Sequence, residues 1–321
     1  MGYKNLPHNY LKYPNVMFAP RNIQVQGKTY KLHIARFNSL YTLYDYLKSN
    51  PETNSSVFRV LESEAGTEAI AGKPYDQAVE DLLIKEDVKY DEFLKLQGSI
   101  NSAIKAKSRT YETVKTLSGG QLNIPAYSAG DPYCFDELQR VKKPKFIKIH
   151  VLVSFNGLTR PKQIENRAII LANLIKALEN AGYSVDIDAF ELSYLDDEIE
   201  YMVVKIKNHG EKTKLSTLYK VLCHVEFFRR ILFRVMETMD FENSWQAGYG
   251  NKCKKEFTYD FLKIGKNDLY FDQPTNMGIR GYDLAEDFEN AIDYLNLNDK
   301  IDVEKAKENF KKEAIKLKLK R

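Results

Sequence analysis

The first part of the chain changes from alternating to helical hydrophobic spacing. Residues 21–36 alternate apolar and polar side chains around Gln26 and Gly27, which predicts a β-hairpin. Residues 37–52 then carry leucine and tyrosine at three- and four-residue spacing, which predicts a helix. Two further helices are predicted over residues 73–86 and 90–108. We therefore expect residues 1–115 to form a small, mainly helical domain with an early hairpin.

From residue 145 onward the pattern is that of a layered α/β domain. Residues 145–155 alternate and then run apolar, residues 159–182 form a long amphipathic stretch, and residues 183–192 again read as a strand. Strand, helix and strand in this order predict a parallel, right-handed βαβ unit. A strand, a long helix, a short strand and a helix are predicted next, over residues 199–208, 215–239, 267–272 and 283–296. This alternation predicts a doubly wound, mostly parallel, Rossmann-like sheet over residues 145–300.

Between these two parts lies a segment rich in glycine, proline and tyrosine. Residues 116–144 begin "TLSGGQLNIPAYSAGDPYCFDE" and read as a linker, in which glycine permits positive φ angles and proline fixes direction. One interpretation is a surface connection that only separates two domains. The other is a loop packed over the edge of the sheet, with Tyr127 or Tyr133 bordering a site.

Composition and charge exclude several classes of protein. The three cysteines stand far apart without a CxxC pair, which fits a reducing compartment such as the cytoplasm better than a disulfide scaffold. The N-terminus lacks the pattern of a signal peptide, and no apolar run is long enough to span a bilayer. Residues 302–321 hold eight basic and four acidic residues, which equals the whole net charge of +4. A neutral body argues against a nucleic-acid groove across the main domain.

The sequence also lacks the common catalytic motifs. It has no GxxxxGK[ST], no GxGxxG after a strand and no GxSxG, so nucleotide hydrolysis, dinucleotide redox chemistry and α/β-hydrolase activity have no motif in support. The five histidines show no HxH or HExxH spacing, so we expect no zinc site.

Four blocks of the chain carry a resemblance to a known group of proteins. In order, they are "FNSLYTLYDYLKSNP", "SEAGTEAIAGKPYDQAVEDLL", "LSGGQLNIPAYSAGDPYCF" and "IHVLVSFNG". Together they resemble a family of uncharacterised proteins found mainly in bacteriophages and other mobile elements. The βαβ half resembles a von Willebrand factor A-type domain. The resemblance implies a place in the host cytoplasm or in the virion, and it brings no established reaction.

The loop that follows the first strand of the βαβ unit is the favoured ligand position in such a fold. The von Willebrand A-type domain places Asp-x-Ser-x-Ser there to hold a divalent cation, whereas this chain has Ser154, Asn156 and Leu158 in that register. Without a carboxylate the set is a poor Mg²⁺ site, and we expect no cofactor. Three interpretations stay open: a loop that only caps the helix, binding of an anion or peptide through residues that include Gly157 and Thr159, and Mg²⁺ completed from elsewhere.

A pair of carboxylates is the second candidate for chemistry. Asp186 and Asp188 lie two apart on a predicted strand, so they project from one face about 6–7 Å from each other. Such a pair can share a metal ion for phosphoester chemistry, with Glu191 or Asp268 as the third acid. The alternative is the solvated side of an edge strand.

The C-terminal residues 301–321 combine an apolar stripe with many basic side chains. We expect a basic amphipathic helix docked on the fold, because cations near a helix C-terminus are favourable. The alternative is electrostatic contact with nucleic acid or an acidic partner, and no membrane contact is expected because the apolar face is short. The basic residues concerned are Lys311, Lys312, Lys316, Lys318 and Lys320.

These observations favour a non-catalytic phage or mobile-element protein. We expect it to bind a phage or host protein through its von Willebrand A-like domain, whose metal site is degenerate, and to act in assembly or in redirecting a host complex. The alternative from another class is a metal-dependent phosphoesterase or nuclease that uses Asp186 and Asp188.

Overall fold

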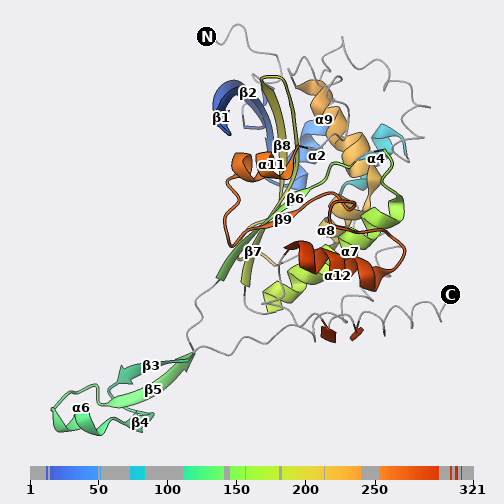
Figure 1. The fold of residues 1–321 in the computed structure, drawn as a ribbon. Coiled ribbons are helices and arrows are strands. Elements are labelled where there is room, and N and C mark those ends of the chain that lie inside the picture. The colour runs from blue at the N-terminus through green and yellow to red at the C-terminus, as the bar shows by residue number, and fades with distance from the viewer. Residues whose placement is uncertain are drawn as a thin grey trace.

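A six-stranded mixed sheet is the centre of the fold (Figure 1). The computed structural model describes residues 12–13, 15–49, 51, 73–83, 111–140, 145–155, 157–180, 183–212, 214–239, 253–295, 304–305, 308–309 and 312. The strands lie in the order β1 (Met17–Val25), β2 (Lys28–Phe37), β8 (Glu198–Lys207), β7 (Tyr183–Leu195), β6 (Lys145–Leu152) and β9 (Leu269–Phe271). We call this sheet and the helices packed on it the body.

The N-terminus is a β-hairpin and not a helical domain, so that part of the prediction was wrong. The hairpin itself was predicted: β1 and β2 pair antiparallel around Gln26 and Gly27, which both have positive φ. Helix α2 (Leu40–Lys48) also forms, and the Ser39 side chain accepts a hydrogen bond from the backbone of Thr42. However, β2 pairs in parallel with β8, so the hairpin extends the main sheet. The sequence pattern could not reveal a partner strand so distant along the chain.

The central βαβ unit forms as predicted. Strands β6 and β7 are parallel and are joined by α7 (Pro161–Asn180). The next connection differs from the expected parallel crossover, because β7 and β8 pair antiparallel. Only Asp196 and Asp197 separate these two strands, and a parallel connection needs a dozen residues or more. The sheet is therefore mixed, with three parallel and two antiparallel strand pairs.

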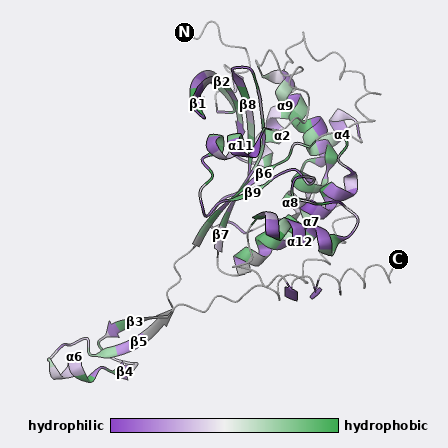
Figure 2. Ribbon diagram, viewed as in Figure 1, coloured by the Kyte–Doolittle hydropathy of each residue, from purple (hydrophilic) through white to green (hydrophobic). Residues whose placement is uncertain are grey.

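Helices cover the two faces of the sheet unequally. One cluster of buried residues includes side chains from α2, α4 (Tyr75–Asp81), α7, α8 (Leu215–Cys223), α9 (Phe233–Thr238) and α12 (Leu284–Leu295). On the other face, a smaller cluster receives Phe257 from α11 (Lys255–Leu262). Figure 2 shows hydrophobic and hydrophilic segments side by side along the helices around the sheet, as expected where each helix buries one face.

The long helix predicted over residues 215–239 is interrupted. Helix α8 ends at Cys223, His224 has an extended backbone, and the chain continues as the π-helix η2 (Phe227–Leu232) and α9. Glu226 accepts a hydrogen bond from His224 at 2.8 Å and pairs with Lys73 at 2.7 Å. Burial alone would raise the pKa of Glu226, but these two contacts outweigh it and lower the pKa to about 2. Through its contact with Lys73, Glu226 therefore links the segment before α4 to the start of η2.

Arg167 of α7 is completely buried where β6 and β9 end. Its Nη1 atom donates to the carbonyl oxygens of Leu152 and Asp272, each at 2.8 Å. Burial lowers the pKa of Arg167 to about 10, so the guanidinium stays charged at neutral pH. One side chain therefore joins α7, β6 and the segment after β9.

Residues 111–140, which we call the arm, form a separate small sheet. Its strands lie in the order β3 (Tyr111–Thr116), β5 (Phe135–Arg140) and β4 (Gln121–Leu122), and the short helix α6 (Ile124–Ser128) follows β4. The expected linker thus holds regular structure, which projects away from the body (Figure 1). Gly120 permits the turn, because its φ is positive and an added Cβ would lie 2.2 Å from the carbonyl oxygen of Asp136.

Replacing Arg167 tests its role in holding the body together. We expect Arg167→Met to lower the free energy of unfolding by about 2–4 kcal/mol, because two buried carbonyl groups and the Asp272 carboxylate lose their cationic partner. Urea unfolding followed by circular dichroism measures the effect, with Lys176→Met on the exposed side of α7 as the control. Equal stability of the two variants would contradict this role.

Candidate functional site

The loop after β6 is partly buried in the protein. Ser154 is fully buried, and its hydroxyl has no hydrogen-bond partner among the residues that the structure describes. Thr159 is buried too, Leu158 is 91% exposed, and a Cβ on Gly157 would meet open space. The remaining residue of the expected binding loop, Asn156, lies outside the described residues. The described residues of the loop thus present a hydrophobic side chain to solvent and bury the hydroxyl-bearing Ser154 and Thr159.

The first turn of α7 is closed by contacts within the protein. The backbone N–H of Arg160 donates to the Gln163 side chain at 2.8 Å, and that side chain donates to the carbonyl of Ile279 at 2.9 Å. Gly281 lies so close that an added Cβ would be 3.0 Å from the backbone nitrogen of Gln163. These contacts favour the interpretation of a helix-capping loop over an anion site at this helix terminus.

The usual ligand position, at the carboxyl ends of β6 and β9, is filled by side chains of the protein itself. In open α/β sheets a ligand commonly binds outside the carboxyl ends of such strands. Here the Arg167 side chain lies there, and the Asp272 carboxylate accepts hydrogen bonds from the backbone of Gln273 and the hydroxyl of Tyr294. The protein's own side chains therefore take up the contacts that a ligand would make.

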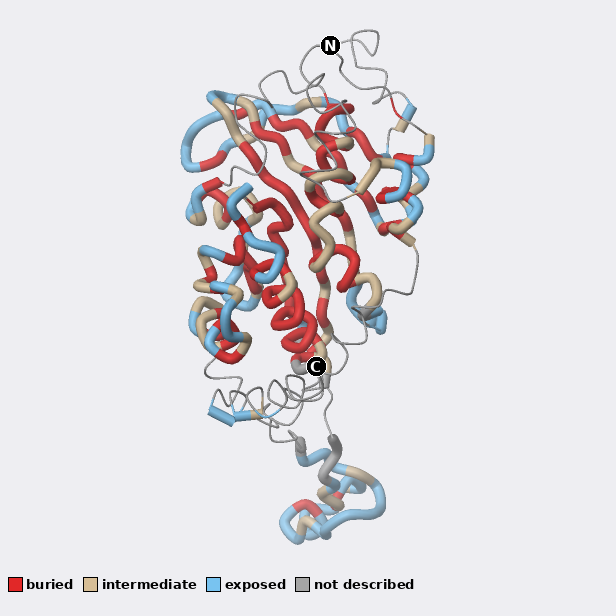
Figure 3. The backbone as a smooth tube through the Cα atoms, turned by 90° about the vertical axis from the view of Figure 1, so that its right-hand side faces the viewer, coloured by how far each residue is buried: buried red, intermediate tan, exposed pale blue. Residues whose placement is uncertain are grey.

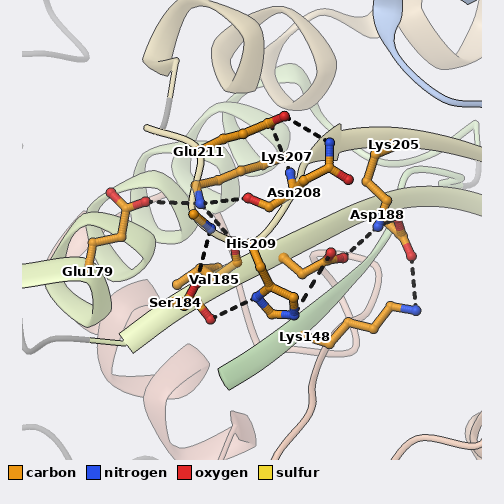
Figure 4. Close-up of polar contacts among 12 residues, drawn as sticks. Lys148, Glu179, Ser184, Val185, Asp188, Lys205, Lys207, Asn208, His209 and Glu211 are labelled. Carbon is orange, nitrogen blue, oxygen red and sulfur yellow. Dashed lines mark hydrogen bonds and ion pairs between the residues drawn. The ribbon is translucent and has the colours of Figure 1, made fainter. Parts of the chain in front are cut away.

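Lys205 bridges Asp186 and Asp188, which lie on the same face of β7. Figure 4 shows Asp188 with its contacts to Lys205 and Lys148. The Lys205 Nζ atom lies 2.5 Å from a carboxylate oxygen of each, and Lys148 lies 3.1 Å from Asp188. Burial alone would raise the pKa of Asp188, but these two lysines outweigh it and hold the pKa below its usual range. The carboxylates are therefore ion-paired and largely neutralised.

This ion-pair network is separate from the loop after β6. Asp188 is paired with His150, four residues before Ser154, which corresponds to roughly 13 Å along the strand. Of the two expected third acids, Glu191 lies on the opposite face of β7, and Asp268 accepts a hydrogen bond from the backbone of Gly265. Within the described ranges, no group of three or more His, Cys, Asp or Glu side chains is placed to hold a metal ion.

The same close-up shows contacts that secure this end of the sheet (Figure 4). The buried Lys207 donates to the carbonyl of Val185 at 2.7 Å and pairs with Glu179 of α7 at 3.3 Å. His209 lies 3.2 Å from the carbonyl of Ser184, and its ring packs edge-on against Phe146. These contacts join α7, β7 and the end of β8, so the charged residues here have a structural role.

A second polar cluster was missed in the sequence. Glu200 of β8 is paired with His33 of β2 on one side and with Ser193 of β7 on the other, and Glu191 lies two residues before Ser193 on the same face. All four side chains are buried. The sequence did contain a signal: Glu191 and Glu200 each stand between two hydrophobic residues in a segment with the pattern of a strand. Such a position indicates a buried acid rather than a solvated one.

The environment of this cluster favours protonated acids. Burial raises the pKa of Glu200 to about 8, and burial together with the neighbouring Glu200 raises the pKa of Glu191 well above its usual range. The Ser193 hydroxyl lies 3.4 Å from Glu200 and offsets only part of this effect. Because both acids are at most 1% exposed, a dissolved substrate cannot reach them, and their effect is on stability.

The arm carries a dense group of exposed hydrophobic side chains. Tyr127 and Tyr133, predicted to border a site, lie on the arm, 64% and 50% exposed, and not beside the loop after β6. We define the arm surface as these two tyrosines together with Leu117, Leu122 and Ile124. Among the arm side chains that the structure describes, only Ala126 and Cys134 are buried, and most of the arm is exposed in Figure 3.

Little of the basic C-terminal segment is described. Residues 304, 305, 308, 309 and 312 are helical, in agreement with the predicted helix. Lys312 pairs with Glu308 at 2.8 Å, one turn earlier. The other four lysines of the predicted basic group, Lys311, Lys316, Lys318 and Lys320, lie outside the described residues.

Comparison with known proteins gives one match. A family model described as a domain of unknown function, DUF7192, matches residues 14–301. No curated protein and no solved structure matches the chain. Within the described residues, no helix is long and apolar enough to cross a membrane.

The buried acid pair makes stability depend on pH. Folded Glu200 releases its proton near pH 8, whereas an unfolded glutamate does so near pH 4.3, so the folded chain binds more protons between these values. Stability therefore falls as pH rises through this window, and the loss is complete above the folded pKa. We expect Glu200→Gln to stabilise the protein by roughly 1–3 kcal/mol at pH 8 and by less at pH 5.

Thermal unfolding at pH 5 and at pH 8 measures this effect. Asp45→Asn, which changes an exposed carboxyl group on α2, is the control and should leave the pH dependence unchanged. A Glu200→Gln variant with the same pH dependence as the unmodified chain would show that the acid pair does not titrate in this window.

Proposed function

The chain belongs to the DUF7192 family, and we propose that it is a non-catalytic protein-binding module whose contact surface is the arm surface. The observation that carries this proposal is the distribution of exposed hydrophobic residues. Six of the eleven large hydrophobic side chains exposed in the described part of the chain lie in residues 111–140, and five of these form the arm surface. Exposed hydrophobic side chains concentrated on one small part of a protein favour an interaction site there.

The missing core of the arm supports the same proposal. Units below about 40 residues usually need disulfides, metals or association to be stable. The arm buries Ala126 and Cys134, and the latter is a free thiol. Covering a side chain such as Ile124 or Tyr127 with a partner would contribute about 1.5–3 kcal/mol, so binding would supply the burial that the arm lacks.

The body then serves as a scaffold for the arm. Its carboxylate pair, the basis of the alternative metal-dependent phosphoesterase, is ion-paired with Lys205, and its helix-capping loop is tied to the segment around Ile279. These contacts support a structural role for the carboxylate pair and for the helix-capping loop.

The resemblance of the four sequence blocks to phage and mobile-element proteins supplies the context of the proposal. In that context the partner is a component of the phage particle or of a host complex, and the chain works in the host cytoplasm or in the virion. The von Willebrand A-like character of the βαβ half fits a binding domain without a catalytic cation.

Affinity purification from the natural host cell tests the proposal. The tagged full chain should recover one or more proteins, and Ile124→Ser combined with Tyr127→Ser should reduce that recovery at least tenfold. The reason is that this change removes two of the most exposed apolar groups of the arm. Quantitative mass spectrometry of the recovered proteins, with sequencing of co-purified nucleic acid, gives the readout.

Tyr41→Ser provides a matched control. Tyr41 is 61% exposed on α2, close to the 64% of Tyr127, but it belongs to the body. Its replacement should leave the recovered proteins unchanged. Equal loss with both variants, or recovery of nucleic acid without any protein, would refute the arm surface as the protein-binding site.

A further inference from the structure

We propose that the arm surface of one copy binds the C-terminal residues 302–321, which we call the tail, of a second copy of this chain. This inference rests on the proposed function, because it names one occupant of the arm surface and thereby a competitor for the phage or host partner. The contact joins two different surfaces of the same chain, so it is heterologous, and each copy offers one arm and one tail to its neighbours.

The first argument is that the tail needs a partner for its apolar residues. Residues 304, 305, 308, 309 and 312 are helical, and four of them, all except 309, are exposed. A short helix is only marginally stable in water, and most of its stability comes from packing of its apolar face. The apolar residues recur at three- and four-residue spacing, as one face of a helix requires, and lie outside the described residues: Val303, Ala306, Phe310, Ala314 and Leu317.

The second argument is charge complementarity between the arm and the tail. Residues 111–140 hold four acidic and two basic residues, a net charge of −2, whereas the tail holds eight basic and four acidic residues, a net charge of +4. Opposite charges on two surfaces favour their encounter, and like charges oppose it. Two arms therefore repel each other, and so do two tails. The charges select contact of an arm with a tail over contact between identical surfaces.

Acidic side chains of the arm lie beside its exposed hydrophobic ones. Asp131 accepts a hydrogen bond from the backbone of Tyr133 at 2.9 Å and pairs with Lys115 at 3.0 Å. Asp136 lies beside the first turn of α6, where it accepts a hydrogen bond from the side chain of the capping residue Asn123 at 2.9 Å. The arm surface is thus apolar with acids next to it, which matches an amphipathic helix with lysines next to its apolar face.

The shape of the chain leaves the arm surface open to a second copy. The five side chains that define it are 41–67% exposed in a single chain. The arm projects from the body in two perpendicular views, which leaves room for a segment of another chain beside it (Figures 1 and 3). Small units with little core gain stability by association, so the contact stabilises the arm and the tail together.

Sedimentation velocity of the full-length protein tests this contact. The unmodified chain should self-associate, and it should do so less as the salt concentration is raised, because salt screens the charges. We define the arm variant as Ile124→Ser with Tyr127→Ser and the tail variant as Phe310→Ser with Leu317→Ser. Each variant alone should weaken self-association about tenfold or more, because each removes apolar groups from one side of the contact.

A mixture of the two variants distinguishes this contact from other modes of association. An equimolar mixture should form a heterodimer, because the intact tail of the arm variant meets the intact arm surface of the tail variant. Association of arm with arm predicts instead that the tail variant self-associates like the unmodified chain. Binding of each tail to its own arm predicts monomers in every sample. Tyr41→Ser on the body is the control and should self-associate like the unmodified chain.

An unmodified chain that stays monomeric at all concentrations would overturn the inference, and so would a mixture without heterodimer. Glu137→Lys guards against a variant that only unfolds the arm, because this side chain is exposed. It should weaken self-association and leave the circular dichroism spectrum unchanged. Self-association equal to that of the unmodified chain would contradict the charge complementarity on which the choice of the tail rests.

Failure of this inference is distinguishable from failure of the proposed function. If self-association is absent but the arm variant recovers fewer host or phage proteins, the proposed function stands alone. If self-association depends on the arm surface but the recovery of other proteins does not, the proposed function is refuted alone. If both hold, the tail variant should recover more partner protein than the unmodified chain, because its tail no longer competes for the arm surface.

Discussion

The buried guanidinium of Arg167 is the interaction on which the body depends. It lies where α7, β6 and the segment after β9 meet, and its hydrogen bonds to Leu152 and Asp272 cross from one strand to the other. A charge at this depth is tolerated only with such partners, because desolvation opposes it. Since the side chain lies where related sheets bind ligands, the same interaction that stabilises the sheet also closes its most favoured site.

Charges inside the body are distributed unequally over the two faces of the sheet. On one face, Lys205 pairs with Asp186 and Asp188, and these contacts help to hold the pKa of Asp188 below its usual range. On the other, burial raises the pKa of Glu191 and raises that of Glu200 to about 8. The first arrangement favours the folded state at neutral pH, whereas the second opposes it as the pH rises.

The body and the arm differ in what holds them together. The body has a large cluster of buried aliphatic and aromatic residues on one face and a smaller one on the other. Among the residues that the structure describes, the arm buries two small side chains, leaves one edge of β3 without a partner strand and exposes many hydrophobic side chains. A unit with so little internal burial gains most from association, which is why we assign binding to the arm and not to the loops of the body.

The sequence by itself determined the elements whose causes are local. The hairpin follows from two residues that adopt positive φ, α2 from the Ser39 cap and its apolar stripe, and the βαβ unit from periodicity between neighbouring segments. Only the tertiary structure decided the pairing of β2 with β8, the bridging of Asp186 and Asp188 by Lys205, and the row that joins His33 to Glu200. These contacts join residues far apart in the chain or on different strands, and periodicity within one segment contains no information about which strand will lie beside it. The arm belongs to the same class, because glycine and proline mark its turns but the strand pairing that makes it a sheet depends on contacts across residues 111–140.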